Sequence, residues 1–98
     1  MKESEIERFF IKKSKKKGWL PVKFLSPSMA GLPDRIVLLP GGQVVFVELK
    51  ATGRKPRPIQ LAVHRVLNQM GFTVFVIDSK EDVVAYVDVI EKKVGGTT

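Results

Sequence analysis

Two short apolar runs separated by Pro40-Gly41-Gly42 constrain the fold of this chain more than any other feature. The runs, residues 34–39 and 43–50, are rich in valine and leucine and too short for typical helices, which favours strands. Proline and glycine between them mark a turn. If Leu39 lies opposite Gln43 across a three-residue loop, the numbers of paired residues add up to 82. The pattern therefore predicts an antiparallel β-hairpin with a defined register.

This register brings three charged residues together. Asp34 lies opposite Glu48, and Lys50 projects from the same strand face as Glu48 because side chains alternate along a strand. Facing carboxylates repel one another unless a cation neutralises them, and a divalent cation with oxygen ligands meets that need. A two-residue loop would instead pair Asp34 with Leu49 and remove the arrangement. With the three-residue loop, the sequence predicts a metal-binding patch.

The residues around this patch resemble a known nuclease motif. Pro33-Asp34 followed by Glu48-x-Lys50 matches the PD-(D/E)xK pattern. A longer string resembles the virus-type replication-repair nuclease (VRR-NUC) branch of that superfamily, from about Glu3 to Val84: Gly31-Leu32-Pro33-Asp34-Arg35, Val47-Glu48-Leu49-Lys50 and Pro58-Ile59-Gln60. The resemblance implies an α/β restriction-endonuclease-like core, in which a mixed sheet is flanked by helices in the order αβββαβ plus a C-terminal helix.

The resemblance also implies a reaction, a cofactor and a set of site residues. The reaction is hydrolysis of phosphodiester bonds in DNA with Mg²⁺ or Mn²⁺, by a structure-selective endonuclease for which Holliday junctions or other branched DNA are expected substrates. We expect Asp34, Glu48 and the backbone carbonyl of Leu49 to hold the metal. Lys50 would orient or deprotonate the attacking water or stabilise developing negative charge, and Gln60 would hold the water or the phosphate.

A first helix is predicted over residues 3–17 and contributes an acidic residue. Its apolar stripe consists of Ile6, Phe9, Phe10 and Ile11. Glu7 falls inside this stripe, and a carboxylate on a buried face needs a partner or a metal. Relatives carry a first-helix glutamate in the active site, so Glu7 is expected to complete the acidic cluster, directly or through water. Glu3, one turn earlier on the same face, is the alternative, and a glutamate that simply reaches solvent is a third reading.

The remaining elements follow from periodicity and from helix-capping residues. We expect strands at residues 19–25 and 72–77, helices from Pro58 to near Gly71 and over 80–92, and a flexible tail over about 93–98. The second helix is expected to bury one apolar stripe, made of Ile59, Ala62, Val63, Val66, Leu67 and Met70. The last helix should pack through Val83, Val84, Val87 and Ile90. Gln60 and His64 lie one turn apart on the flank of the second helix, where a histidine is either structural or binds phosphate or water.

The charge of the chain indicates a polyanionic partner. Its formal net charge is +7 and its pI is near 9.9, which favours nucleic acid. Arg54, Lys55 and Arg57 follow Lys50 directly and are the preferred phosphate contacts. Ser26 and Ser28 precede Asp34 in a loop and could donate to a phosphate, although turn chemistry also explains serines there. The lysines at positions 12, 13, 15, 16 and 17 suit either a solvated surface or phosphate contacts.

Size and composition set the remaining expectations. The 98 residues contain no cysteine, which excludes disulfides and fits a reducing cytoplasm, bacterial or phage-infected. No apolar run approaches the roughly 20 residues that cross a membrane. We expect one domain over residues 1–98, acting as a homodimer because paired incision of a junction needs two sites; Trp19 or the outer face of a helix could hold the dimer. A non-catalytic nucleic-acid-binding protein is the alternative function, and RNA cleavage is not excluded.

Overall fold

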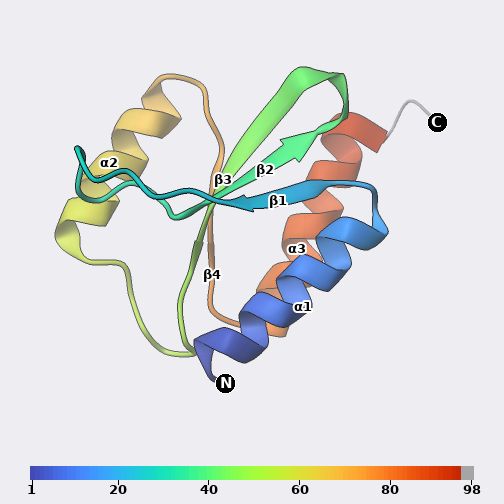
Figure 1. Cartoon of the computed structure of the whole chain (residues 1–98), viewed down its shortest axis with the longest axis horizontal. Helices are drawn as coiled ribbons and strands as arrows, with labels where there is room; N and C mark the ends of the chain where they lie inside the picture. The colour runs from blue at the N-terminus through green and yellow to red at the C-terminus, as the bar shows by residue number, and fades with distance from the viewer. Residues whose placement is uncertain (96–98) are drawn as a thin grey trace.

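A four-stranded mixed sheet with helices on both faces forms the protein in a computed structural model that describes residues 1–95 (Figure 1). The strands lie in the order β1-β2-β3-β4, with β1, β2 and β3 antiparallel and β4 parallel to β3. The elements are α1 (Glu3–Lys16), β1 (Leu20–Lys23), β2 (Arg35–Leu39), β3 (Gln43–Leu49), α2 (Pro58–Gln69), β4 (Val74–Ile77) and α3 (Lys80–Ile90). No helix in residues 1–95 is long and apolar enough to span a membrane. The predicted α/β architecture and element order are confirmed.

The β2–β3 hairpin has the predicted register. Leu39 pairs with Gln43 and Arg35 with Val47, so paired numbers add up to 82. The connection is the three-residue turn Pro40–Gly42, in which Gly41 and Gly42 have φ angles of 82° and 77°. Glycine adopts such positive angles without a steric penalty. Continuing the ladder by one residue places Asp34 opposite Glu48.

One face of the sheet is closed by α1 and α3. Its core contains Phe10 of α1, Val37 and Val47 of the sheet, and Tyr86 of α3, all nearly inaccessible to solvent. The Tyr86 hydroxyl and the Ser14 hydroxyl form a buried hydrogen bond of 2.7 Å, so these two enclosed hydroxyls satisfy each other. Burial raises the pKa of Tyr86 to about 12.

Trp19 belongs to this same core. Only 5% of its surface is exposed, and its ring packs edge-on against Tyr86 with centroids 5.9 Å apart. The indole therefore has a partner within the chain. The suggestion that Trp19 anchors a dimer is wrong, and its alternative, a core role, is confirmed.

The other face carries α2, and here one prediction needs correction. Val63 and Leu67 are buried as expected, but Ile59, Val66 and Met70 are about half exposed or more. Ala62 is exposed as well. The helix is rotated so that Gln60 and His64 face the sheet beside Val63 and Leu67, in place of the four exposed members of the predicted stripe. The inward flank of α2 is therefore partly polar.

Several element ends also differ from the predicted ones. The first strand covers residues 20–23 rather than 19–25, and the fourth begins at Val74 rather than at residue 72. In α3, Val83 and Ile90 are buried as predicted, whereas Val84 is exposed and its place is taken by Tyr86. A π-helical turn at 91–95 follows α3, so the predicted tail begins as ordered backbone and its last part, 96–98, lies outside the described residues.

Candidate active site

The predicted site residues converge where the hairpin ends meet the first turns of α2. Asp34 immediately precedes β2. Glu48 is the second-last residue of β3, and Lys50 follows Glu48 by two residues. Gln60 and His64 project from α2 toward Glu48. Residues from three separated parts of the sequence thus form one cluster.

Gln60 has a fixed orientation because both ends of its amide are used. Its carbonyl oxygen accepts the backbone N–H of Arg57 at 2.8 Å, which caps the start of α2. Its amide nitrogen then donates to Glu48 Oε2 at 3.2 Å. The helix cap therefore holds the side chain that holds Glu48.

Glu48 is a buried carboxylate in which one oxygen accepts a hydrogen bond and the other has no hydrogen-bond partner. The residue is 4% exposed, and Oε2 lies 3.6 Å from the Lys50 ammonium in addition to its contact with Gln60. Oε1 has no hydrogen-bond partner, and His64 Nε2 lies 4.0 Å away from it. Burial raises the pKa of Glu48, and the neighbouring charge of Asp34 raises it further. Glu48 therefore bears an electrostatic strain that a cation would relieve.

Asp34 repeats this situation from the opposite strand. Its Oδ1 is buried without a hydrogen-bond partner. Burial raises the pKa of Asp34, and the charge of Glu3 raises it further, while the charge of Lys50 lowers it. Unpartnered buried carboxylate oxygens are rare in proteins because each costs about 1–3 kcal/mol. Asp34 Oδ1 and Glu48 Oε1 are therefore two acceptors at one site that are free to take a ligand.

The two glutamates proposed from α1 have different surroundings. Glu7 forms an ion pair with Arg35, a residue that is 7% exposed and begins β2. Glu3 acts electrostatically on both Asp34 and Glu48, and it lines a hollow shared with Lys50. The structure therefore brings Glu3 to the acidic cluster and directs Glu7 to Arg35. Sequence reasoning treated Arg35 only as part of a motif, although a lone arginine in an apolar strand beside Asp34 was the available signal.

The donor set is compatible with a hard divalent cation. Within residues 1–95, no group of three or more His, Cys, Asp or Glu side chains is arranged to hold a metal by itself. Asp34 Oδ1 and Glu48 Oε1 nevertheless offer two unpartnered oxygens. Magnesium characteristically uses one or two carboxylates and takes its other ligands from water and phosphate. Two carboxylates and the adjacent Leu49 carbonyl therefore fit such an ion, with substrate and water completing its coordination.

His64 is buried beside this cluster and is neutral at neutral pH. It is 5% exposed, and burial lowers its pKa, with a smaller contribution from the Lys50 charge. Its Nε2 has no hydrogen-bond partner and faces Glu48 Oε1. A neutral imidazole at this position can donate to, or accept from, one group that enters the site.

The predicted phosphate contacts lie on two loops. A hollow of about 320 Å³ is lined by Glu3, Lys50, Ala51, Arg54, Lys55 and Arg57, so the basic loop does adjoin the site. The serines are bonded to each other, with Ser26 Oγ and Ser28 Oγ 3.4 Å apart. Their loop ends at Gly31, where an added Cβ would lie 2.8 Å from the Ile59 carbonyl oxygen of α2. A close backbone approach therefore fixes the path into Asp34.

A mixed sheet whose hairpin carries Pro-Asp and Glu-x-Lys beside a polar helix flank defines a restriction-endonuclease-like nuclease core. No family model matches the sequence. A protein of Acyrthosiphon pisum secondary endosymbiont phage 1, described as "Putative nuclease p44", is 43% identical over 81 residues, covering 83% of this chain and 87% of that protein. A solved structure described as "VRR_NUC domain" superimposes with a TM-score of 0.81 at 31% identity, covering 88% of this chain and 94% of the other. The chain belongs to the VRR_NUC family of nucleases.

Proposed function

We propose that this nuclease cleaves phosphodiester bonds in DNA as an endonuclease that requires Mg²⁺ or Mn²⁺. The observation that carries the proposal is the pair of unpartnered buried oxygens, Asp34 Oδ1 and Glu48 Oε1, with the Lys50 ammonium beside them. A purely structural site would have paired these atoms with donors from the protein. Relatives described as a nuclease and a VRR_NUC domain support the same chemistry.

The residues divide the work as follows. Asp34, Glu48 and the Leu49 carbonyl would hold the metal, with Glu3 or Glu7 contributing charge directly or through water. When bound, the metal supplies an acidified water and stabilises negative charge on the phosphate. The Lys50 ammonium orients that water or balances the developing negative charge.

The α2 residues hold this arrangement in place. Gln60 fixes Glu48 through the 3.2 Å hydrogen bond to Oε2, which leaves Oε1 free to bind the metal. His64 offers an uncharged imidazole nitrogen to a water or to phosphate. Arg54, Lys55 and Arg57 contact phosphates next to the cleaved bond, and Ser26 and Ser28 can donate from the opposite loop.

A homodimer acting on branched DNA completes the proposal, because paired incision of a junction needs two sites related by a two-fold axis. An apolar surface that could hold the dimer is the uncovered part of the α2 side of the sheet. There Leu20 of β1 and Leu38 of β2 are paired neighbours with 52% and 43% of their surface exposed, and Val22 lies on the same face. Sedimentation of wild type and of Leu38→Glu tests this surface, since the charge should yield a monomer that only nicks one strand.

The function is tested by incubating supercoiled plasmid and a four-way junction with the protein, with and without Mg²⁺ or Mn²⁺. Cleavage should require the metal, and Lys50→Ala should lower the rate by about 10²–10³-fold while DNA binding is retained. Lys92→Ala, an exposed lysine of the C-terminal turn, is the matched control and should cleave normally. Metal-independent DNA binding without cleavage would favour the non-catalytic alternative, and cleavage of RNA alone would change the substrate.

A further inference from the structure

Positive charge is concentrated in two segments of the chain. Residues 8–17 contain six lysines and arginines and no acid, and residues 50–57 contain four and no acid. Since the whole chain has 17 basic and 10 acidic residues, the remainder carries seven basic and ten acidic residues. The second segment is the basic loop of the site, so the first needs its own explanation.

Four cations of the first segment are exposed on one face of α1. Arg8, Lys12, Lys15 and Lys16, which we call the α1 ridge, lie within about 100° of one another around the helix axis. Within residues 1–95, none of them forms an ion pair. Glu5, the acid on the same face, accepts the backbone N–H of Lys2 and caps the helix.

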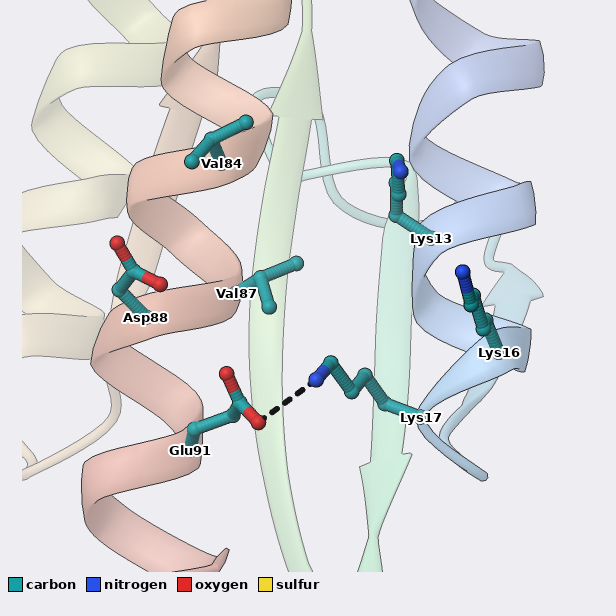
Figure 2. A pocket seen from close by; sticks show the side chains of 7 residues that line it. All are labelled: Lys13, Lys16, Lys17, Val84, Val87, Asp88 and Glu91. Atoms are coloured by element: carbon teal, nitrogen blue, oxygen red, sulfur yellow. Dashed lines mark hydrogen bonds and ion pairs between the residues drawn. The ribbon is translucent and has the colours of Figure 1, made fainter.

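The other two cations of this segment are engaged elsewhere. Lys17 forms a 2.8 Å ion pair with Glu91 (Figure 2). Lys13 lies 5.3 Å from the centre of the Phe9 ring. Figure 2 shows Lys13, Lys16 and Lys17 along a hollow of about 270 Å³ between α1 and α3, with Asp88 and Glu91 on the α3 side. The ridge is therefore the part of the segment whose charge is available to a partner.

The start of α1 is joined to the basic loop of the site, and the ridge begins at Arg8, two turns of helix at most beyond that start. The N-terminal amine donates to Thr52 Oγ1 at 3.0 Å, and the Thr52 N–H donates to the Met1 carbonyl at 3.1 Å, which joins the basic loop to the start of α1. From the first turn, where Glu3 lies, α1 leads away from the site. At about 1.5 Å per residue, Lys16 is about 20 Å farther along. This distance equals about six base pairs of duplex DNA at 3.4 Å each.

We propose that the α1 ridge binds the phosphates of a duplex arm that leaves the active site, reaching about six base pairs beyond the cleaved bond. The inference rests on the proposed DNA cleavage and narrows the substrate class to DNA with such an arm. Because ridge cations contact the DNA backbone rather than the bases, their contribution to DNA affinity should depend on the length of the arm and not on its sequence.

The test compares two DNA lengths in the presence of a chelator, so that binding is measured without cleavage. Four-way junctions have hairpin-capped arms of about twelve or about four base pairs. The shorter arm, about 14 Å long, ends before Lys15 and Lys16, which lie about 18 and 20 Å along α1 from Glu3. The variants are Lys15→Ala with Lys16→Ala on the ridge, Lys55→Ala with Arg57→Ala on the loop, and Lys92→Ala with Lys93→Ala as a control. Each pair removes two charges, and the control pair is exposed and follows α3 rather than α1.

On long arms, the ridge pair should lower the slope of log K against log salt by up to about 1.8 units, and on short arms it should bind like wild type. The loop pair should lose affinity on both lengths, and the control pair on neither. Equal losses for ridge and control pairs, or a ridge loss that is independent of arm length, would overturn the ridge proposal alone. Failure of wild type to bind either junction would overturn the proposed function as well.

Discussion

The two faces of the sheet treat buried polar atoms in opposite ways. On the α1–α3 face, the enclosed hydroxyls of Ser14 and Tyr86 bond each other at 2.7 Å. On the α2 face, Glu48 Oε1 and His64 Nε2 are equally buried but have no partner, and they lie 4.0 Å apart. Both faces are parts of one small domain and share β2 and β3. We propose that this difference reflects two roles, stability for the α1–α3 face and binding of a ligand for the α2 face.

Charge follows the same division. On the α1–α3 face, the apolar core encloses the Ser14–Tyr86 pair, and the buried Arg35 pairs with Glu7 of α1 while its Nε has no hydrogen-bond partner. The α2 face gathers Asp34, Glu48 and Lys50 where burial and like charge raise the pKa of both carboxyls. Functional sites are where proteins accept such costs. Substitutions that should affect one face and not the other test whether the two faces have these different roles.

The largest effect is expected from the closed face. Phe10→Ala removes a ring that is inaccessible to solvent and packs 5.3 Å from Tyr86, so it should lower the free energy of unfolding by about 3–5 kcal/mol. Val66→Ala, on the exposed flank of α2, is the control and should change it by less than about 0.5 kcal/mol. Urea denaturation measures both. A small loss for Phe10→Ala would mean that this face is not the stabilising core.

The next effect sharpens the contrast between satisfied and unsatisfied polar atoms. Tyr86→Phe leaves Ser14 Oγ buried without its partner, so stability should fall by about 1–3 kcal/mol. Adding Ser14→Ala should recover part of that loss, because no orphaned hydroxyl remains. If Tyr86→Phe were as stable as wild type, the hydrogen bond would not support this face.

How much of this contrast the sequence predicted differs between the hairpin and α2. The register was predictable because turn length and side-chain alternation fix it together, and a slip by one residue would expose the buried face. The buried flank of α2 was not, since apolar residues occur on both flanks and periodicity alone favours neither. Gln60 and His64 face the sheet because Glu48 lies there, and this contact joins two elements that local periodicity cannot relate.

The first-helix glutamate shows the same limit. Glu3 and Glu7 are one turn apart on one face, so helical spacing cannot choose between them. The structure separates them through Arg35, which pairs with Glu7 and leaves Glu3 to act on Asp34. That pair joins a helix to a strand, and only the folded arrangement determines it.

The smallest expected change in the free energy of unfolding is a gain rather than a loss. In folded wild type the pKa of Glu48 is raised above its ordinary value of 4.5 by burial and by Asp34. The stability that such a group contributes is full below the ordinary pKa and is lost as pH rises through the folded value. Metal-free Glu48→Gln should therefore be more stable than wild type at pH 7, by about 0.2–1 kcal/mol. The advantage should shrink in thermal melts as pH falls through the raised pKa of folded Glu48 toward 4.5, and it should be absent below 4.5. A loss of stability at pH 7 would contradict this prediction.

Binding of Mn²⁺ without DNA tests the central claim most directly, namely that the unpartnered carboxylates of the α2 face await a cation. Calorimetric titration and thermal melts would compare wild type with Asp34→Asn and with Asp88→Asn, an exposed acid of α3 that serves as the control. Wild type and Asp88→Asn should bind Mn²⁺ and gain about 2.7 kcal/mol of stability when the ion is at a hundred times its Kd. Asp34→Asn should lose most of the binding and most of the gain. Equal Mn²⁺ affinity in Asp34→Asn and wild type would contradict the account.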